Sequence, residues 1–198
     1  MIKYRGLALL YILSCLVRTR LLFSPARLIR FPIDIRNKSA MKWGSGFTTG
    51  KNCRLEAISP KGKEASIKIG NNVQLNDNVH IVSAESVILG DDVLIASKVF
   101  ISDCSHGKYS GIDCSSPDSA PQTRPLYKAP VCIEDRVWIG DNVVVMPGVH
   151  IGAGTIIGAS SVVVDSIPSD CIAVGAPARV IKKYDRIMKQ WVLNEGKE

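Results

Sequence analysis

The chain has 198 residues, of which 46% are hydrophobic but only 6% aromatic, and its formal charge is +7. This length suits one domain with short appendages, and its core must be built from Ile, Val, Leu and small side chains. The positive charge favours a phosphorylated ligand, a membrane surface or nucleic acid as partner. Because the sequence holds no zinc finger, recognition-helix pattern or aromatic RNA-binding strand, we expect no nucleic-acid role.

An apolar run, residues 7–17, lies between Lys3 and Arg5 on one side and Arg18 and Arg20 on the other. It is too short to span a bilayer, which needs about 20 apolar residues, and it lacks an Ala-x-Ala cleavage site. Two interpretations stay open. Residues 1–23 form a basic, apolar helix on an anionic membrane surface, or a helix packed against the protein or a neighbouring subunit. We assign residues 1–36 to this N-terminal, membrane-proximal segment.

From Ile133 to Pro168 the sequence repeats every six residues, as IEDRVW, IGDNVV, VMPGVH, IGAGTI, IGASSV and VVDSIP. The same register extends back through Leu89 and Ile69 to a rougher start at Trp43. A hexapeptide period is typical of a β-solenoid, in which each block is a short strand and a turn. We expect the first-place aliphatic residues to point inward and stack between coils. Glycine at the second place should tolerate the tight corner.

The repeat predicts a solenoid domain over residues 37–181, interrupted by a long loop at 107–130 that is rich in Ser, Pro and Gly. Long loops of this kind in a compact domain are usually functional or disordered. Residues 175–181 should form a turn and a last strand. The basic, amphipathic residues after them predict a C-terminal helix over 182–198.

Six cysteines, at positions 15, 53, 104, 114, 132 and 171, form no Cys-x-x-Cys motif and no close pair. This usage indicates reduced thiols in a cytosolic protein.

Three histidines end their blocks and should therefore lie at corners: His80, His106 and His150. For His80 and His150 a solvated turn residue is the expected role. His106 differs, because it stands where the regular coil gives way to the long loop. An imidazole on a rigid edge beside a loop is well placed to act as a general base near neutral pH.

The hexapeptide blocks, the segment Ser102-Asp-Cys-Ser-His-Gly107 and the segment Gly175-Ala-Pro-Ala-Arg-Val-Ile-Lys-Lys183 resemble the hexapeptide-repeat acyltransferases. Within them, the likeness is to the O-antigen and lipopolysaccharide O-acetyltransferases, and it covers nearly the whole chain. The resemblance implies an all-β fold, a left-handed parallel β-helix, in a homotrimer with active sites between subunits. It also implies acetyl-CoA as acyl donor, no metal, and a sugar hydroxyl of a surface glycan as acceptor. The expected location is cytoplasmic, with or without peripheral contact with the inner face of the membrane.

The resemblance also assigns roles to individual residues. His106 corresponds to the catalytic histidine. The positions expected to bind the acceptor are Asn76, Ser83 and Trp138. The positions expected to bind the cofactor are Asp141, Ala159, Ser161, Val164, Arg179, Lys182 and Lys183.

Three departures from the family pattern stand out. Cys104 replaces the first imidazole of an Asp-His-x-His segment, Val164-Asp165 replaces a Thr-Lys pair beside the cofactor, and Ala84 replaces an acceptor-side carboxylate. The sugar and the hydroxyl that is acetylated therefore stay open.

Two other functions remain as alternatives. A non-catalytic β-helical scaffold would explain the repeat but not the loop, His106 or the basic tail. A γ-class carbonic anhydrase needs three imidazoles on one zinc ion, two of them close in sequence, and His106 has no such neighbour.

Overall fold

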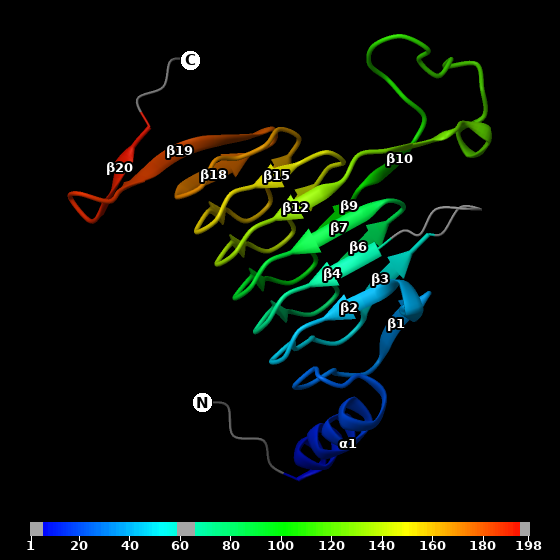
Figure 1. Cartoon of the computed structure of the whole chain (residues 1–198), viewed down its shortest axis with the longest axis vertical. Coiled ribbons are helices and arrows are strands. Elements are labelled where there is room, and N and C mark those ends of the chain that lie inside the picture. The colour runs from blue at the N-terminus through cyan, green and yellow to red at the C-terminus, as the bar shows by residue number, and fades with distance from the viewer. Residues whose placement is uncertain (1–5, 59–65, 195–198) are drawn as a thin grey trace.

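The computed structural model describes residues 6–58 and 66–194. One α-helix, α1 (Leu7–Leu22), is followed by short strands that wind into a stack of coils (Figure 1). Each coil contributes one strand to each of three parallel sheets, which we name faces A, B and C. The chain runs from A to B to C, so the prism has an A–B, a B–C and a C–A corner.

The strands divide among the faces as follows. Face A holds β5 (Gln74–Leu75), β8 (Leu94–Ile95), β13 (Trp138–Ile139), β16 (Ile156–Ile157) and β18 (Cys171–Gly175), extended by β19 (Ala178–Asp185) and β20 (Gln190–Leu193). Face B holds β1 (Ile33–Arg36), β3 (Cys53–Ala57), β6 (His80–Ser83), β9 (Phe100–Ser102), β14 (Val144–Val145) and β17 (Val162–Val163). Face C holds β2 (Met41–Trp43), β4 (Ser66–Ile69), β7 (Ser86–Leu89), β12 (Val131–Ile133) and β15 (His150–Ile151). A separate ribbon pairs β10 (Cys104–His106) with β11 (Leu126–Lys128), and two short 3-10 helices span Lys38–Ala40 and Pro121–Thr123.

Inward side chains stack in register from coil to coil, as the repeat predicts. On face B the column runs through Leu55, Ile81, Ile101, Val145 and Val163. All five side chains are fully buried. No single coil could bury its apolar edge alone, so the stacking of neighbours supplies the core.

The corners follow a rule that differs from the expected one. Residues at the fourth place of several blocks, such as Asn78 and Asn142, carry the left-handed backbone conformation, with φ of 60° and 58°. The second-place glycines are needed for a different reason. A Cβ on Gly70 would lie 2.5 Å from the carbonyl oxygen of Gly90, and one on Gly140 would lie 2.7 Å from the amide nitrogen of Ala159. Glycine therefore permits adjacent coils to approach, and the expected reason, a strained corner, is wrong.

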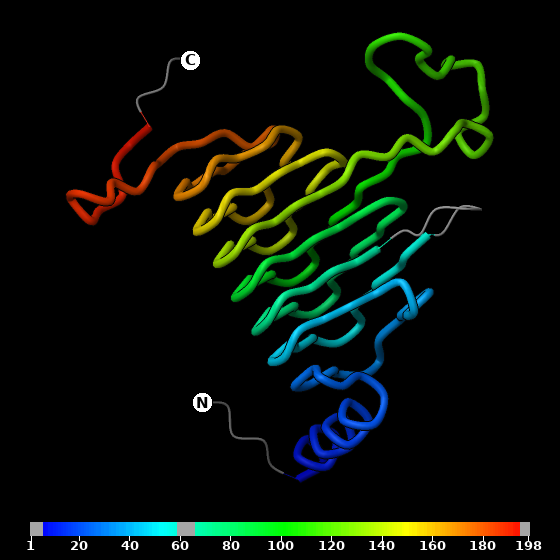
Figure 2. Tube along the Cα trace, in the orientation of Figure 1, coloured from blue at the N-terminus to red at the C-terminus, as the bar shows by residue number. Residues whose placement is uncertain are grey.

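Helix α1 lies under the first coil (Figure 2). Its buried side is formed by Ile12, Cys15 and Thr19. The Thr19 hydroxyl accepts a hydrogen bond from the Ile29 amide at 2.8 Å, and the Tyr11 hydroxyl donates to the Phe31 carbonyl at 2.7 Å. The helix thus packs against its own solenoid, while leucines cover its outer side. In the described part of the chain no helix is long and apolar enough to cross a bilayer.

The predicted C-terminal helix is wrong, because residues 178–193 form the antiparallel hairpin β19–β20 on the edge of β18. The Asp185 carboxylate accepts the amides of Ile187 and Met188, both at 2.8 Å, which closes a turn where a helix would have continued. Across the hairpin, the rings of Tyr184 and Trp191 meet at 5.3 Å. The free edge of β18 and this cross-strand aromatic pair favour strand over helix. Residues 195–198 of the predicted helix lie outside the described residues.

Candidate active site

The chain leaves the regular coil after Ser102 and returns at Val131. The ribbon β10–β11 forms the root of this excursion, pairing His106 with Leu126, and the Gly107 amide donates to the Pro125 carbonyl at 2.9 Å. The loop beyond it stands clear of the solenoid (Figure 1). The His106 side chain is exposed. The proposed base is therefore accessible at the rim and does not point into the core.

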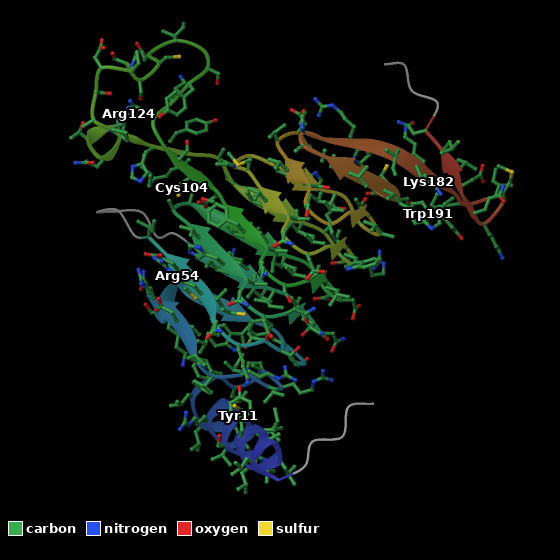
Figure 3. All side chains as sticks on the ribbon, turned by 180° about the vertical axis from the view of Figure 1, so that it is seen from behind. Tyr11, Arg54, Cys104, Arg124, Lys182 and Trp191 are labelled. Atoms are coloured by element: carbon green, nitrogen blue, oxygen red, sulfur yellow. The ribbon has the colours of Figure 1, made fainter. Side chains whose placement is uncertain are left out.

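The loop itself is ordered by the guanidinium group of Arg124 (Figure 3). This group donates to the carbonyl of Ser119 at 2.8 Å, to that of Pro117 at 3.3 Å and to the Tyr109 hydroxyl at 2.8 Å. The Tyr109 hydroxyl in turn donates to the backbone carbonyl of His106. The loop is thus tied to the residue that begins it.

Two other predicted residues share the B–C corner with the root of the loop. The Ser83 side chain is fully buried, and its hydroxyl lies 3.0 Å from both Asp103 Oδ2 and the Ser66 carbonyl. Val164 follows β17 at the same corner and is 44% exposed. In this structure the Ser83 hydroxyl holds the corner together and is not directed at solvent.

The A–B corner gathers a second group. Asn76, Asp141 and the exposed Ala159 follow β5, β13 and β16, and the coil of β8 lies between those of Asn76 and Asp141. Asp141 Oδ1 accepts the Ser97 amide at 3.0 Å, which links two coils. The Ser161 side chain is buried beneath this corner, where its hydroxyl donates to the Gly158 carbonyl at 2.7 Å and accepts the Gly175 amide at 3.0 Å. The Ser161 hydroxyl is therefore taken up by backbone contacts and is not directed at this surface.

Asn76 lies in a polar hollow of about 360 Å³. Its side-chain oxygen accepts a hydrogen bond from Gln74 Nε2 at 3.1 Å. The hollow is also lined by Arg30, Lys51 and Ser97, which are not among the residues predicted from the sequence. Lys51 and Ser97 occupy the third place of their blocks, so the repeat register places them at the same corner as Asn76. Arg30 precedes the repeat and carried no such signal.

Trp138 and Lys182 share the outer surface of face A. Strand pairing joins Trp138 to Ile156, Ile156 to Ile172 and Ile172 to Lys182. Three strand spacings therefore separate the half-exposed indole from the Lys182 backbone, roughly 14 Å. Lys183 is exposed next to it on β19.

Arg179 has an acidic partner. Its guanidinium group lies 3.1 Å from Asp165 Oδ2, and both side chains are more than 60% exposed. Asp165 is the residue that replaces a lysine of the family pattern, so this departure places an anion beside a predicted phosphate-binding cation.

The predicted residues thus form two groups on two corners of one chain. The His106 loop, Ser83 and Val164 lie at the B–C corner, and the Asn76 and Ala159 group lies at the A–B corner. One block of face B separates the corners, roughly 15–20 Å of extended chain. Figure 3 shows Cys104 and Arg124 on the opposite side of the molecule from Lys182 and Trp191.

The other two histidines have distinct surroundings. His150 Nε2 lies 2.9 Å from Glu134 Oε1, and the Glu134 carboxylate also accepts the Ala153 amide. The Ala153 N–H, and then His150, hold the pKa of Glu134 below its usual value. On face B, His80 meets the ring of Phe100 edge-on at 5.2 Å. Burial, and then the charge of Arg54, lower the pKa of His80.

All six cysteines are free thiols. Burial raises the pKa of Cys104, and it raises that of Cys53 to about 11. Cys104 is therefore protonated at neutral pH and is a poor nucleophile. Among residues 6–58 and 66–194, no group of three or more His, Cys, Asp or Glu side chains is arranged to hold a metal ion.

Comparison with known proteins agrees with this architecture. The family described as bacterial transferase hexapeptide (six repeats) matches residues 133–165. The Escherichia coli protein WbbJ, whose name assigns it to lipopolysaccharide biosynthesis as an O-acetyl transferase, is 47% identical over 87% of this chain and 87% of its own. The galactoside O-acetyltransferase of Escherichia coli is 31% identical over 84% of this chain and 78% of its own.

Two solved structures share the fold. An N-acyltransferase from Bacillus cereus, in complex with dTDP and 3-hydroxybutyryl-CoA, is 23% identical, with a TM-score of 0.67 over 83% of each chain. A hexapeptide-repeat acetyltransferase from Vibrio cholerae, complexed with acetyl coenzyme A, is 25% identical, with a TM-score of 0.53 over 80% of this chain and 68% of its own.

We expect the stability of the protein to fall as the pH drops through the titration of His80. The pKa of His80 is lowered from its ordinary value of 6.5 in the folded state. Below pH 6.5 the unfolded chain therefore binds a proton at this histidine more readily than the folded chain does, and this difference favours unfolding. The His80→Gln variant should lose this part of the pH dependence. The test is an NMR titration of the His80 ring, assigned by its absence in His80→Gln. A titration midpoint at or above pH 6.5 would contradict the prediction.

Proposed function

The chain belongs to the hexapeptide-repeat acyltransferases, and we propose that it transfers an acetyl group from acetyl-CoA to a sugar hydroxyl of a lipopolysaccharide-type surface glycan. The proposal is carried by the exposed imidazole of His106 at the root of an ordered loop, in a chain that is 47% identical to WbbJ over most of both proteins. The likeness to a galactoside O-acetyltransferase supports a sugar hydroxyl as the acceptor.

His106 acts as the general base. A sugar hydroxyl is a poor nucleophile at neutral pH, so the imidazole takes its proton as the oxygen attacks the thioester carbonyl. The new ester bond forms, the carbon–sulfur bond breaks, and the protonated imidazole returns its proton to the leaving thiolate of CoA. The His106 side chain is exposed to solvent, and pairing with β11 holds its backbone.

The donor binds along the A–B corner and the outer surface of face A. The small side chain of Ala159 is exposed and leaves room at this corner for a narrow chain such as pantetheine. Lys182, Lys183 and Arg179 supply cations at the end of the solenoid where the CoA phosphates would lie. Asp141 and Trp138 border the same path, and Asn76 lies at its other end, where the acceptor would meet the thioester.

The active protein is a trimer of left-handed coils. In one chain His106 and the proposed donor path lie on different corners, and this separation supports a neighbouring copy as the source of His106 at the A–B corner. A cyclic trimer closes this head-to-tail contact with three equal sites. The Ser83 and Val164 corner then faces the donor path of the neighbour.

The enzyme works in the cytoplasm with α1 against the inner face of the membrane. Residues 1–33 hold six Lys or Arg and no Asp or Glu. On the helix surface that faces away from the solenoid, Leu10, Leu13 and Val17 are 63%, 48% and 60% exposed. Apolar side chains beside unopposed cations suit an anionic lipid surface, and such a surface is where lipid-linked acceptors would be found.

We predict that His106→Ala loses most acetyl transfer, by about 10²–10⁴-fold, because the loss removes the general base. The assay is the release of CoA thiol from acetyl-CoA with a glycan acceptor, alongside a measurement of the oligomeric state. His150→Ala is the matched control and should retain activity. Full turnover in a correctly assembled His106→Ala protein would remove this residue from the mechanism.

The Arg179–Asp165 pair gives a second prediction. Because Asp165 places an anion beside a proposed phosphate contact, Asp165→Asn should lower the KM for acetyl-CoA, with kcat unchanged. An exposed ion pair is worth about 0.2–1 kcal/mol, so the expected change is about 1.5–5-fold. Asp170→Asn, which unpairs Arg186 instead, should leave KM unchanged. A higher KM in Asp165→Asn would contradict this arrangement.

For the membrane contact, we expect the native protein to sediment with vesicles containing phosphatidylglycerol and much less with pure phosphatidylcholine. The triple variant Leu10→Gln/Leu13→Gln/Val17→Gln should lose this binding, because it removes only outward apolar groups. Leu193→Gln, an exposed leucine at the far end of the solenoid, is the control. Equal binding by the native protein and the triple variant would show that the outer surface of α1 does not contact lipid.

A further inference from the structure

Asp103 is an unusual residue for its position. Its side chain is fully buried, and it is the only buried Asp, Glu, Lys, Arg or His among the residues that the structure describes. It lies where the chain leaves the coil for the loop that carries His106. Burial of a carboxylate lowers the stability of the folded state unless its oxygens are hydrogen-bonded. The hydrogen-bond partners of Asp103 therefore indicate what the side chain does in the structure.

Those partners are four donors from one turn. The Asp103 carboxylate accepts the backbone amides of Ala84, Glu85 and Ser86, at 2.6, 2.9 and 2.7 Å. The Ser83 hydroxyl lies 3.0 Å from the same group. Three successive amides that converge on one anion form a nest, in which each hydrogen bond is strengthened by the charge. We name this arrangement the Asp103 clamp.

The clamp holds the root of the ribbon that carries the base. The Asp103 carbonyl accepts the Ala129 amide at 2.9 Å, so the first residue of the excursion is tied to its returning strand. Ribbon β10–β11 begins at the next residue and ends at His106. A two-stranded ribbon is marginally stable by itself, so its direction depends on this anchor.

We propose that Asp103, with Ser83, is a positioning residue for the His106 imidazole. The carboxylate does not touch substrate, because it is buried and its oxygens are occupied by the turn. The Asp103 carboxylate fixes the angle at which ribbon β10–β11 leaves the prism. It thereby fixes the position of His106 relative to the donor path of the neighbouring subunit. This role rests on the proposed function of His106, and it reassigns Ser83 from the acceptor to the support of the base.

The kinetic test uses Asp103→Asn, which keeps the side-chain volume but turns an NH₂ group toward the backbone amides. A displacement of about 1 Å at a reacting group costs about 10²-fold, so kcat should fall by about 10–100-fold. The KM for acetyl-CoA should stay within about twofold, because the donor path is on another corner. Asp135→Asn is the control. Asp135 Oδ1 accepts the Asp91 amide at 2.9 Å at the C–A corner, so its loss should leave kcat unchanged.

A second readout separates positioning from general loss of structure and does not need activity. In NMR spectra, the His106 ring resonance, assigned by its absence in His106→Ala, should shift or broaden in Asp103→Asn, while that of His150 stays in place. Ser83→Ala should produce a smaller change of the same kind, and it serves as the test if Asp103→Asn does not fold. Normal kcat in either folded variant, or an unchanged His106 resonance, would overturn the proposal. An inactive native protein with the predicted NMR shift would instead contradict the proposed function alone.

Discussion

The structure depends on the stacking of short parallel strands, in register, from one coil to the next. Inward side chains such as Ile81 and Ile101 lie directly over one another, and backbone amides of each coil donate to carbonyls of the next. Because every coil repeats the one before it, residues at the same place in successive blocks become vertical columns. The solenoid therefore has long, straight corners, along which side chains from separate coils lie in rows.

This constraint explains why most of the fold could be predicted from the sequence and why the rest could not. The six-residue period determined the inward columns. It placed His106 at the end of a coil block, whereas the chain leaves the coil after Ser102 and His106 lies on the ribbon β10–β11. The period could not determine the end of the chain, where the periodicity of residues 182–193 suited a helix but the open edge of β18 paired with β19. Tertiary pairing overrode local pattern at that point.

The candidate site divides in the same way. Asn76 and Ala159, which stand at the second and third places of their blocks, lie at one corner of the prism. The roles of Ser83 and Ser161 could not be predicted in this way. Nothing about a serine at these positions indicates that its hydroxyl forms buried hydrogen bonds and does not face a ligand. In the sequence, Asp103 stands out only as part of the Ser102–Gly107 motif. Its contacts with three amides come from a coil that is close in space but 17–19 residues away in sequence.

The proposed chemistry is divided between the two corners, with His106 at one and the proposed donor path at the other. A single measurement tests this division most directly, the activity of mixed trimers of His106→Ala and Ala159→Trp chains. The tryptophan would block the donor path at an exposed position and leave the coil intact. Each homotrimer should be inactive, and random mixing of equal amounts should restore about one quarter of native activity, since one site in four joins an intact base to an intact path. No recovery in mixed trimers would show that base and donor path act within one chain.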